Sequence, residues 1–420
     1  MKIPAHLSAA VLAFVITLPF TPPVQANPAW QAAWTTSLQS VPDLASPPGL
    51  YAKPEVSGRT VRQVIYPDLD GREARLRLSN RYGSQPLVVE RATLARSDGA
   101  AGLAAGKVAA VTFGGRASLI LPPGAEADSD TVALPVARGQ ALAVNLTLGP
   151  RQTMQAWHRI ANRVNFISDP GDHAATASVA DFRGHTTHYA WITQLSVPST
   201  RAGSLVAIGD SITDGMRSTF GARHSWPEDL AQRAAAEGQP PLAVLNAGIS
   251  GNRLLSDSPC YGERLVGRFD HDAATLPGVR AIILLIGIND IDFAATPPRR
   301  GLDCDAPHTQ VTANDLINGY KRVIEEARRR GLRIFGGTLT PAALPPAREA
   351  LRQTVNQWIR HGGGFDGVID FDAALRDPQH PAQLLPAYNS GDGVHPSDAG
   401  YAAMAKAVPL MKLRDILSHP

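Results

Sequence analysis

Short apolar runs alternate with turn signals in the first half of the chain. Between residues 27 and 200, several runs alternate apolar and polar positions, and helical periodicity is nearly absent. Turn-forming pairs such as Asp70-Gly71 and Gly114-Gly115 separate these runs. The runs lie at 72–78, 118–121, 131–134 and 141–148. Several short strands at this spacing predict an all-β, sandwich-like domain over residues 27–200.

A different pattern begins near residue 204, where short apolar runs alternate with helical periodicity. The stretch 314–330 is a clear helix, with Leu316, Tyr320 and Val323 on one face and Gly331 as its stop. The apolar runs lie at 205–208, 242–245, 281–286, 332–335 and 368–371, and the helical stretches at 226–237, 314–330, 347–360 and 398–411. Buried strands alternating with helices predict an α/β domain over residues 201–420, with a flavodoxin-like, doubly wound parallel sheet.

Four polar motifs follow these predicted strands. In a doubly wound sheet, sites form beyond the carboxyl ends of the strands, so the motifs are expected to meet. The first contains Ser211, directly after Gly209-Asp210. The others are Asn246-Ala-Gly-Ile-Ser-Gly-Asn252, Gly287-Ile-Asn-Asp290 and, before the last helix, Asp392-Gly-Val-His-Pro396.

These motifs contain the groups that acyl transfer needs. A serine hydroxyl such as that of Ser211 becomes a good nucleophile only beside a base, and His395 titrates in the useful range. Asp392, three residues before His395, could fix the tautomer of its imidazole. The negative charge on the carbonyl oxygen then needs donors, for which the Gly251 N–H and the Asn289 amide are candidates. Taken singly, each residue has a simpler interpretation as a turn or helix-capping residue, and only their joint placement favours chemistry.

Three aspartates near these motifs have structural interpretations. We expect Asp210 and Asp290 to stabilise turns or support the site, and Asp214 to be a charge at the start of a helix.

The four motifs, in order and at this spacing, resemble the SGNH (GDSL-type) hydrolase family, over residues 204–410. The resemblance implies that Ser211 is the nucleophile, His395 the general base and acid, and Asp392 the residue that orients His395. It also implies an oxyanion hole formed by the Ser211 N–H, the Gly251 N–H and the Asn289 side chain. The first motif departs from Gly-Asp-Ser-Leu only in having Ile212 in place of leucine.

The N-terminus has the pattern of a signal peptide. Lys2 precedes an apolar run over residues 7–20, and Val24-Gln25-Ala26 provides a small-x-small site, so cleavage is expected after Ala26. The alternative is a retained anchor, but the run is short for a bilayer and prolines follow it. We therefore expect residues 1–26 to be a signal peptide and the mature protein to be secreted or periplasmic, with no integral membrane segment.

Composition narrows the possible partners. A net charge of +3 on 420 residues gives no case for a nucleic-acid partner. The sequence shows no metal-ligand cluster, phosphate-binding glycine loop or nucleotide fingerprint, so no cofactor is expected. Two cysteines in an exported protein favour a disulfide between Cys260 and Cys304, although two free thiols remain possible.

The predicted function is a carboxylic ester hydrolase that works through an acyl-enzyme. The β-rich domain favours a carbohydrate O-acetylesterase acting on small or polysaccharide esters. One alternative is a lipase or phospholipase, which would need an apolar lid, whereas the segment 293–307 is rich in Pro, Arg and Asp. Another is a carbohydrate-binding module with an inactive hydrolase domain. The aromatic residues of the β-rich domain are expected in its core rather than on a sugar-binding surface: Trp30, Trp34, Trp157 and Trp191. The sequence does not predict the oligomeric state.

Overall fold

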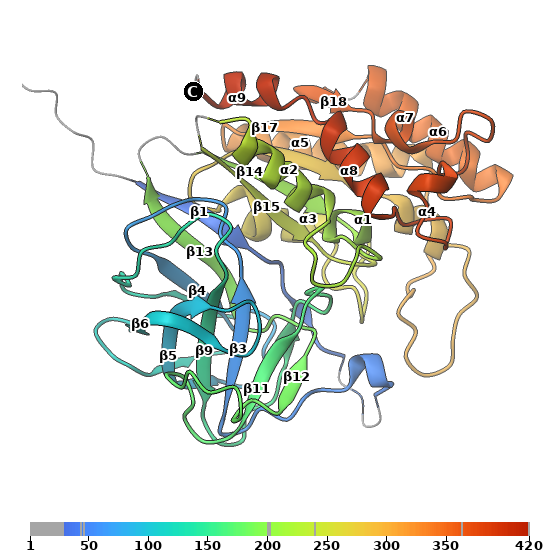
Figure 1. The fold of residues 1–420 in the computed structure, drawn as a ribbon. Coiled ribbons are helices and arrows are strands. Elements are labelled where there is room, and N and C mark those ends of the chain that lie inside the picture. Colours follow the sequence, from blue (N-terminus) through green and yellow to red (C-terminus); the bar gives the residue numbers. More distant parts are fainter. Residues whose placement is uncertain are drawn as a thin grey trace, which may run out of the picture.

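The structure is a computed structural model that describes residues 29–42, 44, 47–199, 203–238, 241–362 and 364–418. The signal peptide expected at residues 1–26 lies outside the described residues and stays a prediction. Figure 1 shows antiparallel strands, coloured blue to green, packed beside a sheet that is flanked by helices and coloured green to red. One continuous cluster of buried apolar side chains runs through both parts.

The N-terminal part is built from antiparallel strands in three sheets. One sheet has the order β1-β13-β4-β8, a larger one the order β12-β11-β3-β9-β5-β6 with β7 beside β5, and β10 pairs with β2. The strands are β1 (Ala29–Thr35), β2 (Gln39–Ser40), β3 (Arg59–Ile65), β4 (Arg75–Ser79), β5 (Leu87–Ser97), β6 (Leu103–Val111), β7 (Leu119–Leu121), β8 (Glu126–Asp128), β9 (Leu142–Leu148), β10 (Ala156–Trp157), β11 (Asn165–Pro170), β12 (Gly184–Thr186) and β13 (Ile192–Ser199), with the 3-10 helix η1 (Gly49–Tyr51). The predicted sandwich-like, all-β character of this part is confirmed.

One predicted strand in this part is wrong. The run 131–134 forms only an isolated bridge between Val132 and Ala74. The N–H of Leu134 bonds back to the carbonyl of Val132 at 2.8 Å, and the next residue, Pro135, has no N–H to offer a neighbour. The chain therefore turns where the apolar pattern predicted a continuing ladder.

The C-terminal part has a five-stranded parallel sheet in the order β15-β14-β16-β17-β18. Its strands are β14 (Gly203–Gly209), β15 (Leu242–Gly248), β16 (Val279–Leu285), β17 (Arg333–Gly337) and β18 (Gly367–Ile369). The helices are α1 (Ser211–Asp214), α2 (Trp226–Ala236), α3 (Leu265–Phe269), η2 (Asp270–Ala274), α4 (Ile288–Phe293), α5 (Ala313–Arg329), α6 (Pro346–His361), α7 (Phe371–Leu375), η3 (Pro386–Tyr388), α8 (Asp398–Ala407) and α9 (Leu410–Ser418). This is the flavodoxin-like strand order, so the predicted α/β fold is confirmed.

The last predicted helix, 398–411, is two helices. α8 ends before Val408, whose backbone is extended at φ −70° and ψ 123°, and α9 starts after Pro409. A proline clashes with helical geometry in the residue before it, so Pro409 forces this break.

The two parts share buried polar contacts as well as apolar ones. The N–H of Ala32 on β1 donates to the Pro277 carbonyl at 2.7 Å, and the hydroxyl of Ser204 on β14 donates to the Ala32 carbonyl at 2.9 Å. These bonds tie the first strand of the N-terminal part to β14 and to the residues just before β16 in the parallel sheet.

The tryptophans of the N-terminal part differ in how deeply their side chains are buried. Trp157 and Trp191 are fully buried, as expected for core residues. Trp34 is half-buried and packs edge-on against Tyr189, with ring centroids 5.1 Å apart. Trp30 is also only half-buried, so the expectation of a core position holds less well for these two side chains.

Candidate active site

Ser211 is the first residue of α1 and follows the turn at which β14 ends. The carboxylate of Asp210 caps α1 by accepting the N–H of Ile212 at 3.1 Å. Gly209 makes the sharp turn possible, because a Cβ there would lie 2.1 Å from the Leu285 carbonyl oxygen. Ser211 therefore projects from a rigid strand end and is only 6% exposed.

Ser211, His395 and Asp392 form one hydrogen-bonded line. The Nε2 atom of His395 is 2.8 Å from the Ser211 Oγ, and its Nδ1 atom is 2.8 Å from Asp392 Oδ2. The other Asp392 oxygen accepts the N–H groups of Val394 at 3.0 Å and His395 at 2.8 Å. The sequence separates Ser211 from His395 by 184 positions, and the sheet brings them into contact.

Asp392 is held as a carboxylate. Partial burial pushes its pKa upward, but hydrogen bonds from the His395 backbone, the His395 ring and the Val394 backbone outweigh burial and lower the pKa to about 2. Arg217 also contacts it, with the guanidinium Nε 3.3 Å from Asp392 Oδ2. An ionised Asp392 fixes the N–H of His395 on Nδ1, which leaves Nε2 free to accept a proton from Ser211.

Gly251 and Asn289 lie on two neighbouring loops that the structure joins. The Nδ2 of Asn289, on the first turn of α4, donates to the Asn252 carbonyl at 2.9 Å, directly after Gly251. The N–H of Ile249 donates to the Gly209 carbonyl at 3.1 Å, which ties the Gly251 loop to the end of the Ser211 strand. Gly251 has φ +82°, and a Cβ there would lie 2.4 Å from the Tyr261 ring. The geometry thus demands glycine at this position.

The sequence of this region matches a known family model. Residues 207–403 match the GDSL-like lipase/acylhydrolase family. These residues thus form a GDSL-like lipase/acylhydrolase domain, which makes the protein a carboxylic ester hydrolase. No curated protein matches the chain.

Several solved structures are similar to the GDSL-like domain. A lipolytic protein of the G-D-S-L family from Desulfitobacterium hafniense is 21% identical, covering 49% of this chain and 96% of its own, with a TM-score of 0.36. A GDSL-like lipase from Bacteroides thetaiotaomicron is 18% identical, with coverage of 50% and 88% and a TM-score of 0.36. An acetylxylan esterase from Geobacillus stearothermophilus is 24% identical, with coverage of 51% and 94% and a TM-score of 0.37.

Two buried carboxylates of the GDSL-like domain support its loops. Asp290 accepts the N–H groups of Leu254 at 2.8 Å and Leu255 at 3.0 Å, and thereby holds the far end of the Gly251 loop. Burial raises the pKa of Asp290 to about 6 and that of Asp210 to about 7. Their positions agree with the expected supporting roles.

Asp214 lies in the first turn of α1, as expected for a charge at the start of a helix. It is also buried, and its Oδ2 accepts both the N–H of Ser250 at 3.0 Å and the Ser250 hydroxyl at 2.5 Å. Its Oδ1 lies 3.1 Å from Nε2 of His158, a residue of the N-terminal part. The sequence did not predict these buried contacts, which arise because all four residues of α1 are buried.

Arg268 is a supporting residue that the sequence did not reveal. Its guanidinium is fully buried and donates to the carbonyls of Gly209 at 2.8 Å and Ala247 at 2.9 Å, and to Asn252 Oδ1 at 2.9 Å. It therefore links the ends of β14 and β15 to the Gly251 loop. An arginine in helical sequence gives no sign of such burial, so only the structure could identify it.

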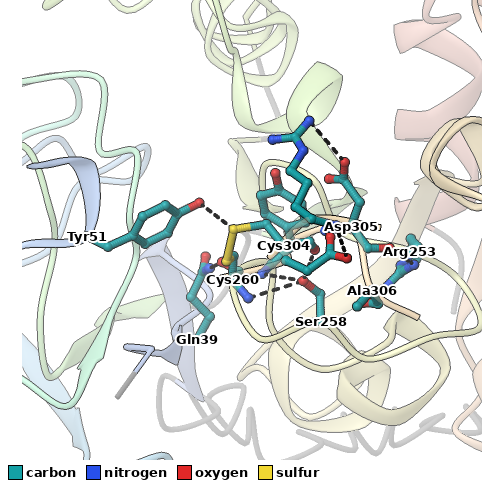
Figure 2. Close-up of a disulfide and its surroundings, with 11 residues drawn as sticks. Gln39, Tyr51, Arg253, Ser258, Cys260, Cys304, Asp305 and Ala306 are labelled. Carbon is teal, nitrogen blue, oxygen red and sulfur yellow. Dashed lines mark hydrogen bonds and ion pairs between the residues drawn. A yellow bond between two sulfur atoms is a disulfide. The ribbon is translucent and has the colours of Figure 1, made fainter. Parts of the chain in front are cut away.

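A disulfide joins Cys260 to Cys304 and confirms the pairing that the even count favoured. Figure 2 shows residues of the N-terminal part beside it: the Tyr51 hydroxyl lies 3.3 Å from the Cys304 sulfur, and the Gln39 amide donates to the Cys260 carbonyl. Tyr261, the residue after Cys260, is the side chain packed against Gly251. The disulfide thus anchors the loop that borders the Gly251 backbone.

The described residues contain neither a cluster of metal-ligating side chains nor a membrane-spanning helix. Within residues 29–418, apart from the few positions not described, no group of three or more metal-ligating side chains occurs. In the same part of the chain, no helix is both long and apolar enough to cross a membrane.

Proposed function

We propose that this protein is an exported esterase that removes short acyl groups, with acetyl preferred, from carbohydrate through an acyl-enzyme on Ser211. The observation that carries the proposal is the unbroken line from Asp392 through His395 to Ser211, with both contacts at 2.8 Å. The family supplies the reaction class, and the substrate and the location are our inference.

The triad would act in two steps. His395 Nε2 takes the Ser211 proton as Oγ bonds to the ester carbonyl carbon, and the carbonyl electron pair moves onto its oxygen. When this electron pair re-forms the carbonyl double bond, the bond to the alcohol oxygen breaks. The alcohol leaves with the proton from His395, and the acyl group stays on Ser211. A water that gives its proton to His395 then attacks the acyl carbon, Ser211 recovers its proton, and the free acid departs.

Three N–H groups would stabilise the negative oxygen. Ser211 is the first residue of α1, so its N–H is not used within the helix. The Gly251 N–H and the second hydrogen of the Asn289 amide, whose first binds the Asn252 carbonyl, would complete the set. Preorganised donors of this kind are each worth about 10²–10³ in rate.

The surroundings of the triad support a small acyl group on a hydrophilic alcohol. Among the described residues, the large apolar side chains that are strongly exposed are scattered, and only Phe220 lies on the loop that carries Arg217. The segment 293–307, the candidate for a lid, carries charged residues such as Arg299, Asp303 and Asp305. Asp392 itself is exposed. An open, polar rim suits a sugar better than a long acyl chain, which needs apolar cover.

An acyl-chain panel tests the substrate proposal. We expect kcat/KM to be highest for p-nitrophenyl acetate and at least about tenfold lower for the octanoate, since the strongly exposed large apolar side chains of the described residues are scattered and would give extra methylenes little apolar contact. Release of acetate from acetylated xylan is expected as well, and Ser211→Ala is the control. A preference for octanoate, or no acetate release from any acetylated saccharide, would favour the lipase or phospholipase alternative.

Fractionation of the host cells tests the location. Export predicts a mature protein that begins at Asn27 and is found outside the cytoplasm. Recovery of the chain from the cytoplasm or membrane with Met1 retained would contradict export, and it would leave the proposed ester hydrolysis unaffected.

A further inference from the structure

His158 connects the N-terminal part to the catalytic turn. It follows β10, and its side chain is 8% exposed, against 4% for its partner Asp214. The distance from His158 Nε2 to Asp214 Oδ1 is 3.1 Å. Asp214 is three residues after Ser211 and closes the helix that Ser211 opens. A residue of the N-terminal part thus contacts the element that carries the nucleophile.

The partners of His158 fix its protonation. Its Nδ1 lies 3.0 Å from the Ser37 carbonyl oxygen, and its Nε2 lies 2.9 Å from the Ile160 carbonyl oxygen as well as near Asp214. All three partners can only accept a hydrogen bond, so both ring nitrogens must carry hydrogen. His158 is therefore an imidazolium. Burial alone would lower its pKa, but the charge of Asp214 and these hydrogen bonds outweigh burial and raise it.

Asp214 transmits this contact to the Gly251 loop. The oxygen that does not face His158 accepts both the N–H and the hydroxyl of Ser250. Ser250 shares a peptide bond with Gly251, so holding Ser250 by its N–H and its hydroxyl restrains the Cα at which the peptide plane with the Gly251 N–H begins. The contacts form a continuous path from His158 to the proposed oxyanion donor.

We infer that His158 is a positioning residue, supplied by the N-terminal part, which holds Asp214 and Ser250 so that the Gly251 N–H points at the oxyanion. This inference rests on the proposed function of Gly251. Because the oxyanion exists only near the transition state, loss of the support should lower kcat and leave KM nearly unchanged. Complete loss of a donor costs about 10²–10³ in rate, so a misaimed one should cost about tenfold.

Other charged groups surround the pair and are the same in every variant. Asp68, Glu228, Arg163 and Arg223 line the adjoining cavity. Both guanidinium groups stack on the Tyr66 ring, at 4.7 Å and 4.5 Å. The ring of Tyr189 lies 6.3 Å from that of His158. Asp68 can also titrate, since burial raises its pKa to about 7. The contribution of His158 to the pH dependence is therefore obtained only from the difference between the wild-type protein and a His158 variant.

The test compares His158→Gln with Ser204→Ala. Ser204→Ala removes another buried hydrogen bond between the two parts, at the opposite end of β14 from Ser211. In His158→Gln we expect kcat on p-nitrophenyl acetate to fall about tenfold, with KM within twofold of the wild-type value. We also expect the wild-type kcat to decline at alkaline pH as His158 loses its proton, and His158→Gln to lack this decline. Ser204→Ala should keep the wild-type kcat and pH profile.

Hydrogen exchange of the segment 246–256, followed by mass spectrometry, measures positioning without turnover. Faster exchange in His158→Gln but not in Ser204→Ala supports the inference even if the substrate proposal fails. Unchanged exchange, or an unchanged kcat despite faster exchange, overturns it. If His158→Gln does not fold, Ser250→Ala removes the hydroxyl contact at the other end of the link and keeps the N–H contact. We then expect faster exchange of residues 246–256 and a lower kcat, and no change in either overturns the inference.

Discussion

The His395 imidazole has a different partner on each nitrogen, and this asymmetry carries the chemistry. Asp392 holds Nδ1, and Ser211 faces Nε2. The same division holds at Asn289, which uses one amide hydrogen on the Asn252 carbonyl and leaves the other for a substrate. Each of these side chains therefore has a structural contact that aims its reactive atom.

Replacement of Asn289 by alanine tests this double role. Asn289→Ala should lower kcat by about 10²–10³ through loss of an oxyanion donor. The lost bond to Asn252 should lower the free energy of unfolding by about 1 kcal/mol. Steady-state kinetics and urea unfolding measure the two effects.

The matched control for Asn289 is Asn356→Ala. Asn356 is a buried asparagine that bonds both the N–H and the carbonyl of Leu339. This variant should lose at least as much stability and little of its rate. Equal losses of kcat in both variants would show that Asn289 acts through stability alone.

The sequence predicted the residues of the proposed site but not the residues that support them. Ser211, His395, Asn289 and Gly251 stand in motifs whose order along the chain is informative by itself. His158 and Arg268 lie in ordinary sequence, and their importance comes from burial and from contacts that the fold creates across long separations.

At the scale of elements, the loop after β15 is the most constrained part of the site. Its backbone is held by Asp214 at Ser250, by Asn289 at Asn252 and by Asp290 at Leu254 and Leu255. Three different side chains thus fix a loop of a few residues, which preorganises its N–H groups before substrate arrives.

Gly251→Ala tests the loop against a glycine with similar backbone geometry. Gly251 has φ +82° with the Tyr261 ring in the path of a Cβ, whereas Gly221 has φ +76° and open space. Both alanine variants should lose about 1 kcal/mol of stability from the left-handed backbone, and Gly251→Ala should lose more because its Cβ clashes with the Tyr261 ring. Only Gly251→Ala should also lose at least about tenfold in kcat, measured on p-nitrophenyl acetate, because its loop must shift away from Tyr261. A wild-type kcat in Gly251→Ala would contradict the assigned loop geometry.

Periodicity predicted the long helices and the parallel sheet, but it missed the longest strands, β5 (Leu87–Ser97) and β6 (Leu103–Val111), and it failed where other constraints dominate. The run 131–134 turns at Pro135, and the last helix breaks at Pro409, in both cases because proline overrides an apolar pattern. Short elements such as β2, β10 and α1 are below the length at which a pattern can be recognised.

At the scale of the whole molecule, the two parts behave as one body. Their buried apolar residues form one cluster, and hydrogen bonds cross between them at Ala32, Ser204 and His158. The N-terminal part is therefore packed and hydrogen-bonded against the C-terminal part and is not a loosely tethered domain.

The His158–Asp214 pair makes the stability of this junction depend on pH. The pKa of His158 is raised in the folded protein, so its stabilisation is full below about pH 6.5, its unfolded value, and is lost as pH rises through the folded pKa. Thermal melting of wild type and His158→Gln should therefore differ most at about pH 6 and converge at alkaline pH. A difference that stays constant or grows with rising pH would contradict a protonated His158.

Removal of the N-terminal part tests whether the C-terminal part depends on it for stability and activity. The fragment 203–418 would expose the apolar face that β1 covers and leave Asp214 without His158. We expect it to be less stable than the full chain and at least about tenfold slower on p-nitrophenyl acetate and acetylated xylan alike. A folded fragment with full activity on the small ester and none on xylan would instead make the N-terminal part a substrate reader.

The central claim is that Ser211 is the nucleophile of an ester hydrolase, and kinetics of Ser211→Ala test it most directly. On p-nitrophenyl acetate, with folding checked by circular dichroism and Ser204→Ala as the control serine near the same strand, we predict that kcat falls by about 10⁴ or more. A Ser211→Ala protein that folds and hydrolyses the ester at the wild-type rate would contradict the account.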